Sequence, residues 1–238
     1  MTYIILAAGR GCRLHPITVN CPKSLFKLDE STTVIERMTT LIKKYDKNSR
    51  IYVVIGFMYK DVIKNLEDVA FIHNPFYDVT NSMASLWFAR DILDGTDDIV
   101  IINGDIVTEE KMMMDVVCIK PVRPQVLVDS SVKSQGDYNV QVCDEKVVVM
   151  SKELDDYFGE YAGITKINAD SVNFLNESIG KLIEEGQYDQ WYENALVQMI
   201  FRYNFSLYYT DVSEYNWTEL DDVSDLVRAK RIINVRED

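Results

Sequence analysis

The sequence predicts an α/β fold with a doubly wound, mainly parallel sheet, and two observations carry this prediction. Short apolar runs rich in β-branched residues recur in the first half of the chain, at residues 2–6, 51–55, 69–74 and 98–105. Such runs are typical of parallel strands buried on both faces. Helix-like segments separate the runs, and strands that alternate with helices indicate parallel pairing.

Helices of the first half are predicted from apolar spacing and from end signals. Residues 33–45, "TVIERMTTLIKKY", repeat apolar side chains at helical intervals, and Thr33 with Glu36 fits a capping box at the start. Two further helices are expected, at about residues 58–67 and from about Asn81 to Leu93.

The pattern changes after about residue 120, where a small antiparallel insertion is expected in a mixed sheet. Asp144 and Glu145 are predicted to form a tight turn between the last two strands of the insertion. The expected strands are residues 124–130, 138–143, 146–151 and 205–209. The expected helices are residues 169–186 and 189–202, followed by a polar segment and a closing helix within residues 216–233. With no internal repeat and no Pro/Gly-rich linker, one continuous domain over residues 1–238 is predicted.

Charge and cysteine content exclude several classes of protein. The chain carries 38 acidic and 25 basic residues, for a formal net charge of −13. Such a field disfavours nucleic acids and anionic membrane surfaces as partners. No apolar run approaches the ~20 residues needed to span a bilayer, and the first residues lack the charged region of a signal peptide. The four cysteines show no CxxC spacing, so reduced thiols in a cytoplasmic protein are expected.

Residues 6–25, "LAAGRGCRLHPITVNCPKSL", predict an anion site. They belong to a stretch of 28 residues with four bases and no acid. Gly9 and Gly11 would let backbone N–H groups approach phosphate oxygens, while Arg13 and Lys23 would add positive charge. Ligands of open parallel sheets bind beyond the carboxyl ends of the strands, where this loop is expected. The alternative is an ordinary strand-to-helix turn with solvated bases.

The combination of a strand, "LAAGRGCRL" and "PKSL" resembles the nucleotidyltransferase family, which joins a nucleoside triphosphate to a phosphorylated small molecule and releases pyrophosphate. The family motif is LAAG-x-G-[ST]-R-[LFM] followed by P-K, and Cys12 stands here at the Ser/Thr position. The resemblance implies a Rossmann-like sheet of the nucleotide-diphospho-sugar transferase type. It also implies that Arg13 and Lys23 hold the triphosphate. The nucleotide-binding set that it implies is Leu6, Ala8, Gly9, Gly11, Arg13, Lys23, Asn81, Ser85 and Gly104.

Carboxylates at two places predict a Mg²⁺ site. Nucleotidyl transfer depends on charge neutralisation, which a hard divalent ion supplies. Asp105 closes the strand 98–105 on the sheet edge that carries the loop, and a metal-binding Asp stands there in the family. Glu219 and Asp221 in "WTELDD" would point the same way from an extended segment, and this segment resembles "W-x-E-I-D" of bacterial CTP:phosphocholine cytidylyltransferases. The alternative is a cap on the last helix, the role expected for Asp222.

The nucleotide and the acceptor are suggested by further resemblance. Residues 74–90, "NPFYDVTNSMASLWFAR", resemble the "NP-x-[FY]-x-x-x-N-x-x-x-SL" segment of choline-type cytidylyltransferases, which implies that Asn81 and Ser85 contact the nucleoside of CTP. On physical grounds alone Asn81 is an N-cap and Ser85 a small packing residue. Acceptors of this group carry a phosphate or phosphonate and mostly an amino or cationic end, which carboxylates or aromatic faces would bind. The candidates are Asp129, Glu160, Tyr192 and Glu193, with Glu160 preferred and a surface or core role as the alternative for each.

These observations together predict a cytoplasmic, Mg²⁺-dependent cytidylyltransferase for surface polysaccharide or lipid decoration. The acceptor is of the phosphocholine, aminoethylphosphonate or phosphoglutamine type, and the catalytic residues are Arg13, Lys23 and Asp105. Residues 1–120 form the nucleotide-binding half, and residues 121–238 form the acceptor half with the closing helix. No nucleic acid or membrane partner is expected, and a homodimer is left open. The alternatives are a sugar-1-phosphate uridylyl- or thymidylyltransferase and a non-catalytic nucleotide sensor.

Overall fold

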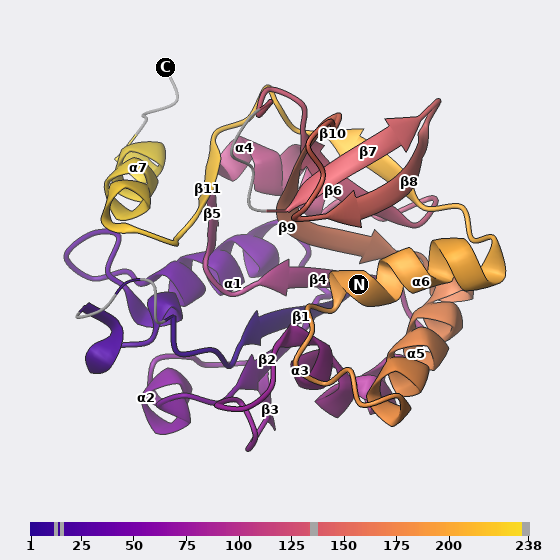
Figure 1. Cartoon of the computed structure of the whole chain (residues 1–238). Coiled ribbons are helices and arrows are strands. Elements are labelled where there is room, and N and C mark those ends of the chain that lie inside the picture. The colour runs from indigo at the N-terminus through magenta and orange to yellow at the C-terminus, as the bar shows by residue number, and fades with distance from the viewer. Residues whose placement is uncertain (12–13, 15–16, 134–137, 235–238) are drawn as a thin grey trace.

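A computed structural model describes residues 1–11, 14, 17–133 and 138–234. Cys12 and Arg13, which the sequence analysis singles out, lie outside the described residues. Within them, a nine-stranded sheet has the order β3-β2-β1-β4-β9-β6-β10-β8-β7 (Figure 1). Its first four strands pair in parallel, which confirms the predicted parallel half. They are β1 (Thr2–Ala7), β2 (Arg50–Ile55), β3 (Ala70–His73) and β4 (Ile99–Asn103).

Strand β9 (Gly159–Ile167) joins the two halves of the sheet, and the sequence analysis missed it. It pairs antiparallel with β4 on one side and with β6 (Gln125–Asp129) on the other. Two glycines, a glutamate, a threonine and a lysine interrupt its apolar pattern, although all but one of its residues are buried. Lys166 can be buried in this strand because its ammonium donates hydrogen bonds to the carbonyl oxygens of Val116 and Ile119.

The remaining strands form the predicted insertion only in part, because not all of them pair antiparallel or join the main sheet. The hairpin of β7 (Asn139–Cys143) and β8 (Lys146–Ser151) is confirmed, with Asp144 at φ 55° in its turn. Strand β10 (Tyr208–Asp211) begins later than the predicted strand at 205–209 and pairs parallel to β6. A separate two-stranded sheet joins β5 (Ile106–Thr108) to β11 (Trp217–Glu219).

The helices agree with the predicted order but differ at their ends. The capping box of Thr33 and Glu36 is present at the start of the first helix. The predicted helix from Asn81 to Leu93 is two elements in the structure. An α-helix ends at Phe88, and a separate 3-10 turn follows at Arg90–Ile92. The helices are α1 (Val34–Tyr45), α2 (Tyr59–Lys64), α3 (Ser82–Phe88), α4 (Glu110–Met112), α5 (Ala169–Glu184), α6 (Glu193–Tyr203) and α7 (Val223–Asn234), and α4 continues as a π-helix over Met113–Val117. None in the described part is long and apolar enough to cross a membrane.

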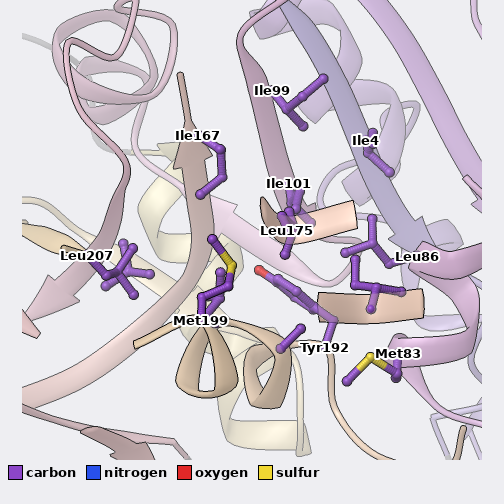
Figure 2. Close-up of a cluster of buried hydrophobic side chains, with 14 of the residues drawn as sticks. Ile4, Met83, Leu86, Ile99, Ile101, Ile167, Leu175, Tyr192, Met199 and Leu207 are labelled. Atoms are coloured by element: carbon purple, nitrogen blue, oxygen red, sulfur yellow. The ribbon is translucent and has the colours of Figure 1, made fainter. Parts of the chain in front are cut away.

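Alternating side chains of β1 build two hydrophobic cores, one on each face of the sheet. Ile4 belongs to the core that α3, α5 and α6 cover, where Figure 2 shows it with Leu86, Leu175 and Met199. Tyr3 and Ile5 belong to the opposite core, which includes buried residues of α1 and α2. Helices on both faces explain why the parallel strands are apolar along their whole length.

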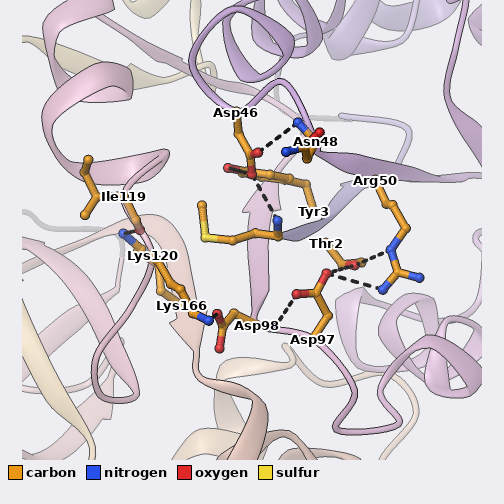
Figure 3. Close-up of polar contacts among 11 residues, drawn as sticks. Thr2, Tyr3, Asp46, Asn48, Arg50, Asp97, Asp98, Ile119, Lys120 and Lys166 are labelled. Atoms are coloured by element: carbon orange, nitrogen blue, oxygen red, sulfur yellow. Dashed lines mark hydrogen bonds and ion pairs between the residues drawn. The ribbon is translucent and has the colours of Figure 1, made fainter.

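The amino ends of the strands are tied together by polar side chains, as Figure 3 shows. Thr2 donates a hydrogen bond to Asp97 (2.9 Å), and the guanidinium of Arg50 donates to both side chains. The hydroxyl of Tyr3 donates to Asp46 (3.2 Å). These side chains are therefore hydrogen-bonded to one another at the amino ends of the strands.

Candidate active site

The loop that follows β1 combines two glycines with different physical roles. Gly11 has φ +65°, and a Cβ there would lie 2.6 Å from Cγ of Lys23, so a side chain is excluded. The carbonyl of Gly11 accepts a hydrogen bond from the buried Thr18 hydroxyl (2.8 Å), which holds the turn. A Cβ at Gly9 would meet no protein atom within 4 Å, yet Gly9 lines a cavity. Gly9 therefore borders open cavity space, whereas Gly11 packs against Lys23.

That cavity, of about 230 Å³, lies at the carboxyl ends of β1 and β4. Of the predicted nucleotide-binding residues within the described part, all line it: Leu6, Ala8, Gly9, Gly11, Lys23, Asn81, Ser85 and Gly104. Gly104 is required by contact with β1, because a Cβ there would lie 2.8 Å from the carbonyl oxygen of Leu6. The structure thus brings the loop, the Pro-Lys turn and the start of α3 to one place.

Asn81 and Ser85 also make the structural contacts that their alternative interpretations predict. Asn81 is the N-cap of α3, and its side chain accepts from the backbone N–H of Ser82 (2.8 Å). The Ser85 hydroxyl accepts from the buried Asn74 amide (3.1 Å) and donates to the Asn81 carbonyl (3.4 Å). Both residues lie on the cavity wall, so a ligand role stays a prediction for each.

The acids converge because β11 pairs antiparallel with β5. Asp105 directly precedes β5, and its carbonyl accepts a hydrogen bond from Leu220 N–H (3.1 Å) just beyond the end of β11. Carboxylate oxygens of Asp105, Glu219 and Asp221 consequently lie within 4.8 Å of one another. Residues more than a hundred positions apart in the chain therefore form the predicted carboxylate cluster.

Asp222 has the capping role expected of it. Its carboxylate accepts from the backbone N–H groups of Ser224 (2.6 Å) and Asp225 (3.0 Å) at the start of α7. Asp225 in turn accepts from the N–H groups of Asp221 (3.0 Å) and Asp222 (2.9 Å). This reciprocal cap holds the backbone of Asp221 and leaves its carboxylate directed to other partners.

Lys23 lies inside the carboxylate cluster. Its ammonium is 2.6 Å from Asp221 and 3.2 Å from Asp105. Burial by itself would lower the pKa of Lys23, but the two carboxylates outweigh it and the pKa is raised. Burial raises the pKa of Asp105, the charge of Lys23 opposes this rise, and Asp221 adds to it.

The donor set fits a divalent metal ion. Three carboxylates that can each offer one oxygen are the ligand type that Mg²⁺ and Ca²⁺ prefer. The ammonium of Lys23 already serves as a cation among two of them, which indicates that the site attracts positive charge. Asp105, Glu219 and Asp221 would hold such an ion.

Glu193 is the predicted acceptor residue that lies on the cavity wall. It is 4% exposed, and its Oε2 has no hydrogen-bond partner among the described residues. Burial raises the pKa of Glu193 to about 7, against the opposing effects of a hydrogen bond with Asn103 and the charge of Lys152. Trp191 lines the same wall and is 39% exposed, with the Lys152 ammonium 4.2 Å from its ring centroid.

The other three acceptor candidates do not line the cavity. Asp129 is buried, and its side chain accepts hydrogen bonds from the Trp217 indole (2.9 Å) and the Ser131 hydroxyl (2.6 Å). These contacts tie β6 to β11 and to the loop after β6. Tyr192 is fully buried and lies in the core that Figure 2 shows. Its hydroxyl donates a hydrogen bond to the Thr165 hydroxyl (3.0 Å). Glu160 is half-buried on β9, opposite Asp129. An acceptor role for Glu160 stays a prediction, on a strand that the sequence analysis did not include.

Sequence reasoning missed five polar residues of the wall, namely Ser24, Tyr77, Thr80, Ser82 and Asn103. Ser24 follows Lys23 directly, is 4% exposed, and its hydroxyl has no hydrogen-bond partner in the described part of the chain. Asn103 ends β4 and interacts with Glu193. All but Tyr77 lie next to a predicted site residue, so adjacency to the Pro-Lys pair, to Asn81 and to the Gly-Asp pair was the available signal.

Comparisons with known proteins show the family and the fold of the chain. A family model described as "Nucleotidyl transferase" matches residues 2–128, more than half of the chain. The CTP:phosphoglutamine cytidylyltransferase of Campylobacter jejuni is 27% identical over 95% of this chain and 98% of its own length. The choline-phosphate cytidylyltransferase of Streptococcus pneumoniae is 33% identical over 95 residues, which cover 39% of this chain and 41% of that protein.

A shorter match links the chain to the bifunctional protein GlmU of Methanococcus aeolicus, at 30% identity over 115 residues. This match covers 47% of the chain and about a quarter (26%) of that protein.

Two solved structures share the fold. A CTP:phosphocholine cytidylyltransferase from Streptococcus pneumoniae gives a TM-score of 0.78 at 22% identity, covering 97% of this chain and 98% of that one. An inositol-1-phosphate CTP transferase from T. maritima gives a TM-score of 0.73 at 16% identity, covering 100% and 98% of the two chains. The predicted fold class and the family resemblance are confirmed.

Proposed function

The chain belongs to the nucleotidyl transferase family, and from that premise we propose that it transfers CMP from CTP to a small acceptor bearing a phosphate or phosphonate. One observation carries the proposal. One cavity is lined by the glycine loop, by Lys23, Asp105 and Glu219, and by the Glu193–Trp191 wall. The choice of CTP is supported by the cytidylyltransferase relative that matches 95% of the chain. The assignment of binding roles to residues 1–120 and 121–238, and a cytoplasmic location, belong to the same proposal.

The reaction needs positioning and charge stabilisation rather than a base. An anionic oxygen of the acceptor attacks the α-phosphorus of CTP, a new P–O bond forms, and the bond to the β-phosphate oxygen breaks as pyrophosphate leaves. Gly9 and Gly11 would expose backbone N–H groups to the phosphates, and Lys23 would neutralise charge on the leaving group. Asp105, Glu219 and Asp221 would hold Mg²⁺, which when bound neutralises the triphosphate.

The acceptor's far end is proposed to be an ammonium group. Glu193 offers a buried carboxylate oxygen without a hydrogen-bond partner among the described residues, and Trp191 offers an aromatic face. A cation is attracted to both groups. The contact of the Lys152 ammonium with the Trp191 ring, 4.2 Å from its centroid, supports cation binding by this ring.

Pyrophosphate release in the presence of Mg²⁺ tests the proposal, with four nucleoside triphosphates crossed against an acceptor panel. The panel holds phosphocholine, phosphoethanolamine, 2-aminoethylphosphonate, phosphorylated glutamine and glucose-1-phosphate. Turnover is expected with CTP and an amino-bearing acceptor. Turnover with UTP or dTTP and the sugar phosphate would contradict the proposal and favour sugar-1-phosphate transfer. CTP binding without turnover would indicate a sensor.

The two loop glycines should respond differently to alanine. Gly9→Ala is expected to raise the KM for CTP about tenfold, equivalent to roughly 1.4 kcal/mol, because its methyl group enters open ligand space. Its Tm should stay unchanged. Gly11→Ala should lower Tm by about 2–4 °C or more, since its φ of +65° strains an L-residue and Lys23 blocks the methyl group. Equal effects of both changes on Tm would contradict the separation of roles.

A further inference from the structure

Lys23 contacts two of the three carboxylates that would hold a divalent ion. Its ammonium lies 3.2 Å from Asp105 and 2.6 Å from Asp221, and both residues belong to the three-carboxylate cluster. The side chain of Lys23 is 11% exposed, and those of the two acids are 19% and 14% exposed. The contact is therefore a partly buried ion pair, which solvent screens less than a surface pair.

The stem of Lys23 is held in this position by the phosphate loop. Its Cγ, Cδ and Cε atoms all lie within about 3 Å of where a Gly11 Cβ would be, so the aliphatic chain packs flat on that glycine. Lys23 also begins the 3-10 turn that follows Pro22. The same glycine loop is proposed to bind the triphosphate, which brings phosphate oxygens and the Lys23 ammonium into one cavity.

An ammonium and a divalent ion beside the same two carboxylates repel each other and compete for the negative charge of Asp105 and Asp221. We propose that Lys23 is a built-in counter-ion that excludes divalent metal from the carboxylate cluster until a triphosphate draws its ammonium away. This inference rests on the proposed function. Nucleotide binding then vacates the metal site, and the displaced ammonium neutralises the phosphates.

Displacement of Lys23 would make nucleotide and metal binding cooperative. A ligand that removes Lys23 from the acids raises the affinity for the ion, and by linkage the ion raises the affinity for the nucleotide. Metal alone binds weakly, although the three carboxylates are already within 4.8 Å of one another. The lysine thus acts at two positions in turn.

Binding of Mn²⁺ alone, measured by electron paramagnetic resonance, tests this directly. Lys23→Met keeps a stem of similar length and removes the charge, so Mn²⁺ should bind the variant at least about tenfold more tightly than wild type. Lys23→Arg keeps the charge and should behave as wild type. Lys27→Met makes the same change in net charge on an exposed residue whose ammonium contacts only the Glu30 carbonyl in the described structure, and should leave Mn²⁺ affinity within twofold.

Thermal unfolding gives a second measurement that does not depend on activity. Lys23→Met leaves the two acids without their ammonium, so its Tm should fall and Mn²⁺ should restore it, whereas Mn²⁺ alone should not shift wild type. A variant that folds only with Mn²⁺ would support the inference in the same way.

Two outcomes would overturn the inference, and they are distinguishable. Equal Mn²⁺ affinity of wild type and Lys23→Met without nucleotide would show that the lysine does not compete, and would leave the proposed function standing. Failure of both proteins to bind Mn²⁺, with no calorimetric signal for the Mn²⁺–CTP complex, would overturn the metal site and the proposed function together.

Discussion

Asp105→Asn is expected to lower turnover by at least about 10³-fold, because it removes one charge from the carboxylate cluster at the point where transition-state charge is stabilised. The fold should remain, since Asn has the same shape and Lys23 keeps its contact of 2.6 Å with Asp221. Burial raises the pKa of Asp105, so the neutral amide also relieves a buried charge. Pyrophosphate release and the Tm, measured side by side, check both parts of the expectation.

Asp222→Asn is the matched control. Asp222 follows the cluster directly but caps α7, and Asn is an equally good N-cap, so turnover and Tm should equal those of wild type. Turnover of Asp105→Asn within tenfold of wild type would show that the carboxylate cluster does not carry the chemistry.

Glu193→Gln is expected to raise the KM for an ammonium-bearing acceptor by about tenfold or more while leaving the KM for CTP unchanged. The reason is that a hydrogen bond to a charged partner is worth about 1.5–3 kcal/mol. In wild type this KM should fall as pH rises through about 7, because the pKa of Glu193 is raised to about 7 and only the ionised form attracts the cation. In the variant it should show no such dependence.

The same variant should be more stable than wild type at alkaline pH. The pKa of Glu193 rises from its ordinary 4.5 to about 7 on folding, so the folded state holds the proton more tightly than the unfolded state. This contribution to stability is complete below pH 4.5 and is lost as pH rises through about 7. Glu193→Gln has no such loss, and its advantage above pH 7 is on the order of 3 kcal/mol. Urea unfolding at pH 4 and at pH 8 measures the difference.

Asp189→Asn provides the control for Glu193, because Asp189 precedes the same helix, is exposed, and does not line the cavity. It should leave the acceptor KM, its pH dependence and the unfolding free energy unchanged. A pH-independent acceptor KM in wild type would contradict the ammonium-binding role of Glu193.

Local patterns in the sequence determined the parallel half of the fold and one side of the candidate site. Continuous apolar runs predict buried strands, and the spacing of Thr33 and Glu36 predicts a capping box. Both signals can be read within a few residues of sequence. The glycine loop and Asp105 were predicted to lie close together for a related reason. The carboxyl ends of β1 and β4 must meet at one edge once the strands pair in parallel.

Only the tertiary structure decided the other side of the site. Strand β9 is polar in places and is recognisable as central only when its neighbours are seen, since Lys166 finds its partners across the fold at Val116 and Ile119. Glu160, the preferred acceptor candidate of the sequence analysis, lies on this strand, whereas Glu193 lies on the cavity wall at the start of α6. The contact of Lys23 with Asp221 spans 198 residues of sequence. Contacts at such separation leave no local pattern, because they exist only after the β5–β11 pairing has formed.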